Sequence, residues 1–245
     1  MKELAHCLMG SQNYFLDGPD SDKDYKVFVY PTFNDLYKNH RLDKGDLPSE
    51  YPRDDHYSPM DVRTFASNLL KGNVNCLEYV FSTEWVVKDK DFEFLASAAR
   101  KLFESGYLLV CWETFFASLE GMVKNSLDRY GVTHKSMSRA YYFYVFASSL
   151  VVDNFKMTNH SWRGNKWNND VRAMRFNENA WLPSREELEK TLGFLKGTAA
   201  ESVKRMRKYR PELVEELKQQ GKEFEGYVKW LVANKVCNEL KMGDY

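Results

Sequence analysis

Two aspartates near the start of the chain constrain its fold more than any other feature. Asp22 and Asp24 are one residue apart and lead into the apolar run Val27–Tyr30. We expect the aspartates to occupy alternate positions of the strand that continues through this run, and therefore to share a face of the sheet, because alternate residues of a strand point the same way. Two carboxylates held side by side repel each other unless a cation lies between them. The pattern therefore predicts a cation site at the start of a strand.

A glycine-serine turn, Gly10-Ser11, precedes the aspartates and follows a short apolar run. Glycine has no side chain to keep a phosphate away from the backbone, and serine offers both a hydroxyl and an N–H group to phosphate oxygens. Mg²⁺ is commonly bound by one or two carboxylates together with substrate phosphates. We therefore expect Gly10 and Ser11 to bind a triphosphate whose metal ion is held by Asp22 and Asp24. Mg²⁺ is the expected ion and Mn²⁺ the alternative.

Three longer motifs extend this pattern. They are Gly-Ser-Gln-Asn-Tyr at residues 10–14, Asp-Ser-Asp-Lys-Asp-Tyr-Lys at residues 20–26 and Leu-Leu-Lys-Gly-Asn-Val-Asn-Cys-Leu-Glu at residues 69–78. Together they resemble the DNA polymerase beta-type nucleotidyltransferase superfamily. In detail they are similar to its bacterial and phage branch of RNA-repair-pathway nucleotidyltransferases. The resemblance covers the chain to about Ser82.

The resemblance implies a chemical reaction and a set of binding residues. The reaction is the transfer of a nucleoside monophosphate from a nucleoside triphosphate to a hydroxyl, with release of pyrophosphate. Within the motifs, Tyr14, Ser21 and Lys26 join Gly10 and Ser11 as candidate nucleotide-binding residues. Lys26 follows the aspartates at strand spacing, so we expect it to share their face of the sheet.

The acceptor hydroxyl is left open by the motifs. The resemblance favours an RNA 3′ end, such as that of a damaged tRNA. Two alternatives are a protein hydroxyl, as in nucleotidylating antitoxins of the same superfamily, and the synthesis of a signalling oligonucleotide. A fourth interpretation, from a different class, is a catalytically inactive protein that binds a nucleotide or RNA without turnover.

A two-metal transfer site usually needs a third carboxylate. Asp55 is the first candidate because it lies on an expected short strand, where the resemblance puts this acid. Asp54 is the second, and Glu78 is an alternative because a glutamate within an apolar run needs a partner. Ser58 and the proline after it predict the start of a helix, with Asp61 as part of its cap.

A segment in the second half of the chain interleaves basic and aromatic residues. Trp162, Arg163, Lys166 and Trp167 combine cations with flat rings, a pattern typical of single-stranded nucleic-acid binding. We therefore take them as candidate acceptor-binding residues. The tryptophans could equally anchor a loop to the core. A second basic run, at residues 204–210, is explained by a solvated helix end.

Patterning divides the chain into two parts. Strand-like and turn-rich sequence at residues 1–88 predicts a small mixed-sheet palm, and helical periodicity at residues 89–245 predicts a mainly helical domain, so the expected class is α+β. Residues 141–152 are apolar on nearly all sides, which predicts the central helix of the second part. Ser184 and Glu187 form a capping box for a further helix, and Pro211 starts the last one.

Composition excludes several classes of partner. The 35 lysines and arginines balance 35 aspartates and glutamates, so nucleic acid must be bound through a local patch rather than by net charge. The four cysteines are far apart and predict neither a zinc site nor a disulfide framework. The sequence contains no apolar run of membrane-spanning length. We expect a cytoplasmic protein without a membrane partner, and its oligomeric state stays open.

Overall fold

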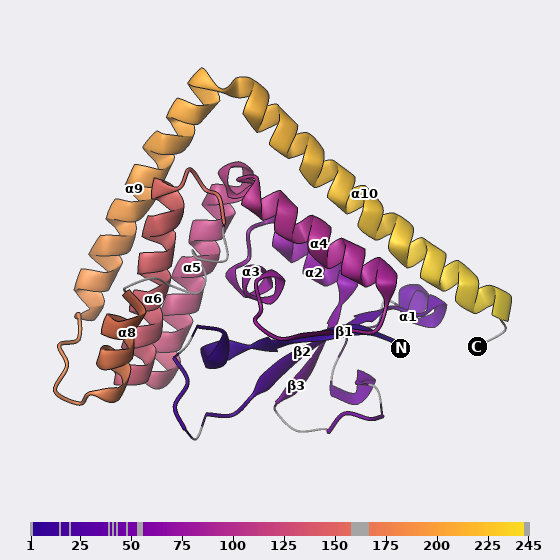
Figure 1. Cartoon of the computed structure of the whole chain (residues 1–245), viewed down its shortest axis with the longest axis horizontal. Helices are drawn as coiled ribbons and strands as arrows, with labels where there is room; N and C mark the ends of the chain where they lie inside the picture. The colour runs from indigo at the N-terminus through magenta and orange to yellow at the C-terminus, as the bar shows by residue number, and fades with distance from the viewer. Residues whose placement is uncertain are drawn as a thin grey trace.

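A four-stranded mixed sheet lies in the first part of the chain (Figure 1). A computed structural model describes residues 2–14, 16–19, 21–38, 40, 42, 44–47, 49–52, 56–157 and 167–242. The strands are β1 (Lys2–Met9), β2 (Asp24–Tyr30), β3 (Tyr57–Asp61) and β4 (Trp85–Val87), in the order β3-β2-β1-β4. The central strand β1 pairs antiparallel with β2 and β4, whereas β2 and β3 are parallel.

Helices make up most of the rest of the described chain. Their bounds are η1 (Gly10–Tyr14), α1 (Phe33–Lys38), η2 (Lys44–Asp46), α2 (Val62–Leu70), α3 (Val74–Val80), α4 (Lys90–Glu104), α5 (Leu108–Tyr130), α6 (His134–Val152), α8 (Trp167–Phe176), α9 (Arg185–Tyr209) and α10 (Pro211–Met242). No helix in the described ranges is both long enough and apolar enough to cross a membrane.

The two faces of the sheet have different surroundings. Pairing of Met9 with Asp24 and of Cys7 with Lys26 puts these side chains on the face that continues through Phe28 into the main core, which we call the inner face. The opposite, outer face carries Val27 and packs on a small separate cluster with Leu47. Charged residues on the inner face therefore lie next to the helices.

One core joins the inner face of the sheet to the helices. Phe28 on β2 packs against Phe65 on α2 and Phe92 on α4, with ring centroids 4.9 and 5.1 Å apart. Helix α6 contributes Phe143 and Phe146, both almost fully buried, as its apolar sequence predicts. Figure 1 shows α9 and α10 as a long angled pair that runs around the outside of α4, α5 and α6.

Local sequence signals at helix ends are confirmed in several places. Ser184 and Glu187 form the predicted capping box of α9, and α10 begins at Pro211. All four strands lie before residue 88, and every element described from Lys90 onward is helical. The α+β class is therefore confirmed, whereas the identity of the sheet as a nucleotidyltransferase palm stays a prediction.

The predicted helix start at Ser58 is wrong. Residues 57–61 form β3, which pairs in parallel with β2, with Ser58 opposite Lys26. The helix begins after Asp61, which is itself the N-cap and accepts a hydrogen bond from the Arg63 N–H at 2.7 Å. The serine-proline pattern was outweighed by strand pairing, a tertiary interaction that a local motif does not report.

Candidate active site

The Gly10-Ser11 turn lies where β1 passes into η1. Gly10 has a φ of +82°, a left-handed conformation that favours glycine. A Cβ at this position would lie 3.5 Å from Oδ2 of Asp24, so the turn runs directly beside the carboxylate at the start of β2. The Gly10 N–H donates to the carboxylate of Glu78, which is buried on α3. The glycine is thus held between two acids, one exposed to the site and one behind it.

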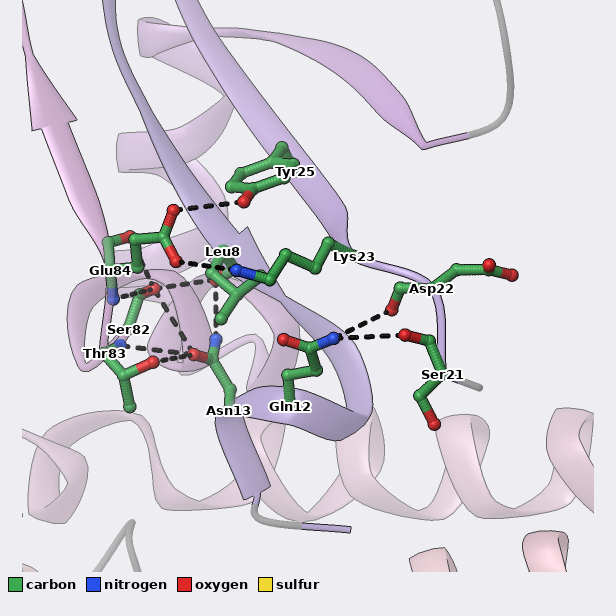
Figure 2. A network of polar contacts seen from close by, with 10 residues as sticks. All are labelled: Leu8, Gln12, Asn13, Ser21, Asp22, Lys23, Tyr25, Ser82, Thr83 and Glu84. Carbon is green, nitrogen blue, oxygen red and sulfur yellow. Dashed lines mark hydrogen bonds and ion pairs between the residues drawn. The ribbon is translucent and has the colours of Figure 1, made fainter. Parts of the chain in front are cut away.

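A network of polar contacts connects this turn to its neighbours (Figure 2). Asn13 is fully buried; its amide nitrogen donates to the Leu8 carbonyl at 2.6 Å, and its amide oxygen accepts from the Thr83 N–H at 3.2 Å. Ser82 donates to the same Leu8 carbonyl at 2.7 Å. Such a satisfied network fixes η1 against the loop before β4. The Asn13 side chain of the Gly-Ser-Gln-Asn motif therefore has a structural role.

Gln12 of the same motif orients the loop before β2. We call this loop, which carries Asp17, Ser21 and Asp22, the acidic loop. Figure 2 shows the Gln12 amide nitrogen donating to the carbonyls of Ser21 and Asp22, at 3.3 and 3.4 Å. The Ser21 hydroxyl accepts from the Gly18 N–H at 2.8 Å and closes the turn before β2. Ser21, predicted to bind nucleotide, has this turn contact in the structure. The sequence offered both polar residues, but not their partners.

The two aspartates do not share one strand as predicted. Strand β2 begins at Asp24, because Met9 is the last residue of β1 that pairs with it. Asp22 lies in the preceding loop, is exposed, and in Figure 2 points away from Gln12. Asp24 lies on the inner face and one of its carboxylate oxygens is 3.4 Å from Nδ1 of His56. Asp24 is therefore the acid that the fold presents to the helices.

Of the three candidates for the third carboxylate, the structure describes only Glu78. Asp54 and Asp55 lie outside the described residues. Within the described part of the chain, no group of three His, Cys, Asp or Glu side chains is close enough together to hold a metal ion. The alternative, Glu78, accepts from Gly10 and from the Asn13 amide at 3.4 Å, so its place is behind the turn. Asp61 is the N-cap of α2, and its predicted role in a helix cap is therefore confirmed.

Lys26 lies on the inner face beside Asp24, as its spacing predicts. Its ammonium group donates to the Ser58 hydroxyl at 2.6 Å and lies 5.7 Å from the centre of the Tyr79 ring. Burial lowers the pKa of Lys26, while the nearby thiol groups and Glu78 oppose this shift. This lysine contacts the parallel strand β3 from within the sheet.

A cleft of about 570 Å³ separates the glycine turn from the helices. Gly10, Ser11 and Asp24 form one side of it. The other side comes from the ends of α5, α6 and α8, which Figure 1 shows beside the start of η1. Its lining there includes the cations Lys135, Arg139 and Arg175 and the hydroxyl-bearing residues Ser126, Tyr130, Thr133 and Ser136.

The two arginines of the cleft are poorly compensated by the described part of the protein. The Arg139 Nε is buried and has no hydrogen-bond partner among the described residues. Burial, followed by repulsion from Arg139, lowers the pKa of Arg175, and the attraction of Asp17 does not outweigh this shift. Leaving a buried polar group unpaired is costly, so the Arg139 guanidinium fits a ligand that supplies negative charge. Such a charge would also offset the repulsion between Arg139 and Arg175.

Sequence reasoning missed the most informative of these cations. Arg139 lies one turn before Phe143, which is fully buried, and its guanidinium is 6.0 Å from that ring. A single arginine on an otherwise apolar helix face was the available signal. Arg175 follows the basic and aromatic segment of the sequence analysis by eight residues and lies near the end of α8. Trp162, Arg163 and Lys166 lie outside the described residues, and Trp167 is described only as the first residue of α8.

The side chain of Tyr14, the last residue of η1, also lies outside the described part of the chain. No protein-family model, no curated protein and no solved structure matches this chain. Its function has to be argued from the chemistry of the cleft.

Proposed function

We propose that the protein is a metal-dependent nucleotidyltransferase that moves a nucleoside monophosphate from a nucleoside triphosphate to an acceptor hydroxyl, with an RNA 3′ end as the acceptor. The observation that carries the proposal is the opposition of two walls across one cleft. Asp24 and the open backbone at Gly10 lie on one wall, and Arg139 and Arg175 lie on the other. A metal-bound triphosphate joins a cation to a polyanion, and these walls are complementary to its two parts.

The donor groups on the first wall suit Mg²⁺. The Asp24 carboxylate faces the cleft, and a hard divalent cation prefers carboxylate and phosphate oxygens. Asp22, Asp24 and Asp55 would hold the ion, with Glu78 as the alternative to Asp55. When bound, Mg²⁺ would lower the pKa of the acceptor hydroxyl and offset phosphate charge.

The chain's own residues would orient the triphosphate. Gly10 leaves room for phosphate oxygens beside the backbone, and Ser11 offers its hydroxyl and N–H. In the reaction, the acceptor oxygen forms a bond to the α-phosphorus while the bond from that phosphorus to the bridging oxygen breaks. Pyrophosphate leaves with the electron pair, and the hydroxyl proton passes to solvent. Arg139 and Arg175 would stabilise the charge that develops on the leaving group.

The test is pyrophosphate release and label transfer with each α-labelled triphosphate, with Mg²⁺ or EDTA, and with or without total RNA. We expect Asp24→Asn and Asp22→Asn to lower the rate by about 10²-fold or more, because each removes a negative oxygen from the metal. Asp153→Asn, at the far end of α6, is the control and should retain wild-type rate. Triphosphate binding without pyrophosphate release from any triphosphate would instead support a binding protein without turnover.

A further inference from the structure

One exposed aromatic residue lines the cleft, a second directly follows the cleft residue Arg175, and each lies against arginine. Tyr130 ends α5, lines the cleft and is 57% exposed; the Arg129 guanidinium lies 5.2 Å from the centre of its ring. Phe176 ends α8 and is 50% exposed; Arg172 and Arg175 lie 5.5 and 5.6 Å from its ring. We call these residues the rim. Large exposed rings outside a core are candidates for contacts with a partner.

Phe176 and Arg172, the part of the rim on α8, contact the acidic loop. A Cβ on Gly18 would lie 3.2 Å from Cε1 of Phe176, so the loop backbone packs closely on the ring edge. The Asp17 carboxylate is 4.0 Å from the Arg172 guanidinium. The Phe176 ring is therefore next to the loop that leads through Asp22 to Asp24. A molecule lying on the Phe176 ring would therefore be close to the loop that leads to the proposed reaction site.

The two parts of the rim are fixed relative to one another. Nδ1 of His134, the first residue of α6, is 2.6 Å from the Met174 carbonyl oxygen of α8. His134 follows α5 by only a short turn, so this contact ties the Tyr130 end of α5 to the Phe176 end of α8. Both rings are consequently held on a rigid helical frame, which lowers the entropic cost of binding.

The chemistry of the rim specifies the kind of partner. A single-stranded polynucleotide presents flat bases, which stack on aromatic rings, and phosphates, which pair with arginine. A duplex keeps its bases stacked on each other and would leave the rings without a partner. The chain as a whole is neutral, so Arg129, Arg172 and Arg175, which lie against the two rim rings, are a local complement to a polyanion.

We propose that the rim binds the end of a single-stranded polynucleotide, with bases stacked on Tyr130 and Phe176, and delivers its terminal hydroxyl to the cleft. This inference rests on the proposed transfer reaction, whose acceptor it defines. It assigns acceptor binding to residues other than the tryptophan-containing segment at 162–167.

The experiment measures binding without triphosphate, using fluorescence anisotropy of labelled oligonucleotides, about 12 nucleotides long, across a salt series. The probes are single-stranded RNA, single-stranded DNA and duplex RNA of the same sequence. We expect at least one single strand to bind and the duplex to bind at least about tenfold more weakly. Comparison of the two single strands identifies which sugar is accepted.

The variants separate stacking from charge. Tyr130→Leu and Phe176→Leu keep apolar volume but remove the ring, and each should weaken single-strand binding roughly 5- to 150-fold with little change in salt slope. The double variant Arg129→Met/Arg172→Met should reduce the slope by about 1.4, or roughly 0.7 for each phosphate that is no longer neutralised. Melting temperatures check that all variants are folded.

A matched aromatic–cation pair far from the cleft serves as the control. Tyr209 is 67% exposed with Lys208 5.1 Å from its ring, at the α9–α10 junction, which lies at the opposite end of the helical layer in Figure 1. Tyr209→Leu should bind single strands as the wild type does.

Two results would overturn the rim proposal. One is wild-type single-strand affinity in both Tyr130→Leu and Phe176→Leu, and the other is failure of the wild type to bind either single strand. Pyrophosphate release in the latter case would leave the transfer reaction standing and direct the search for an acceptor to a protein hydroxyl. Single-strand binding through the rim without any pyrophosphate release would uphold the rim and reject the transfer reaction.

Discussion

Buried charge is compensated differently on the outer face of the sheet and in the cleft beside its inner face. On the outer face, the buried Glu3 carboxylate accepts from the Tyr51 hydroxyl at 2.7 Å and pairs with Lys88 and with His6, at 2.5 and 2.9 Å. In the cleft on the inner side of the sheet, the buried Nε of Arg139 on α6 has no hydrogen-bond partner among the described residues. Within the part of the chain that the structure describes, the Glu3 carboxylate is satisfied and this guanidinium nitrogen is not.

Shifts in pKa report the same difference. Burial acts to raise the pKa of Glu3, but hydrogen bonds from Lys88, His6 and Tyr51 outweigh it and the pKa is lowered. Burial and the neighbouring Arg139 lower the pKa of Arg175, so its charged form is disfavoured where it stands. A charge favoured by its surroundings contributes to the fold, whereas a disfavoured charge in a cleft is a candidate for ligand binding. The comparison assigns structure to the outer network and function to the cleft.

The largest expected effect comes from removing an arginine from the cleft. Arg139→Met and Arg175→Met should each weaken triphosphate binding at least about tenfold, since a charge-assisted hydrogen bond contributes about 1.5–3 kcal/mol. The free energy of unfolding should stay equal or rise, because repulsion between the two guanidinium groups is removed. Calorimetric titration and thermal unfolding measure the two quantities.

The control for this pair is Arg185→Met. Arg185 pairs with Asp128 and Glu189 at 2.9 Å, on the surface and outside the cleft. Triphosphate affinity should be unchanged in this variant. Loss of stability without loss of affinity in Arg139→Met would place that arginine in the core and contradict the comparison.

The next largest effect comes from removing the Glu3 charge from the outer network, which consists of Glu3, His6, Tyr51 and Lys88. Glu3→Gln should lower the free energy of unfolding by about 2 kcal/mol, because a buried charged acceptor with several donors is lost. Triphosphate affinity should stay at the wild-type value, since Glu3 is on the opposite face of the sheet. Denaturant unfolding and the same titration decide this. A variant with normal stability and impaired binding would reverse the roles that we assign to the two faces.

A smaller effect concerns the glycine turn. Gly10→Ala should cost about 1–2 kcal/mol of stability, because alanine is strained at a φ of +82°. Gly106→Ala is the matched control, with a φ of +106° and a nearest atom also 3.5 Å from the added Cβ. Both should be destabilised, but only Gly10→Ala should also weaken triphosphate binding. Equal affinity in the two variants would remove Gly10 from the binding site.

The smallest effect is the acid dependence of the outer network. Because the pKa of Glu3 is lower when folded than when unfolded, its contribution to stability is present above its ordinary pKa of 4.5 and is lost as the pH falls through the folded pKa. The difference in unfolding free energy between wild type and Glu3→Gln should therefore shrink below about pH 4.5. Urea unfolding at a series of pH values measures it, and a constant difference would contradict the hydrogen-bonded network.

Features carried by neighbouring residues were predictable. The glycine-serine turn is where the motif predicts it, the Ser184–Glu187 capping box starts α9, and α10 begins at Pro211. These features depend on backbone conformation and on hydrogen bonds within a few residues, which a short stretch of sequence specifies. The α+β class follows in the same way from strand-like sequence before residue 88 and helical periodicity after it.

The functional geometry depended on residues far apart in the chain. Strand pairing with β2 turned Ser58 from a helix cap into a strand residue, and burial beside Gly10 made Glu78 a partner of the turn. Arg139 and Arg175 meet Asp24 across more than a hundred residues of sequence, and only the packing of α6 and α8 brings them to one cleft. By itself the sequence determined the fold class and the ends of elements that local hydrogen bonds and caps specify, such as the start of α9, because those interactions are local. The tertiary structure decided which buried charges find a partner within the described part of the protein and which do not, because neutralisation depends on partners that only folding brings together.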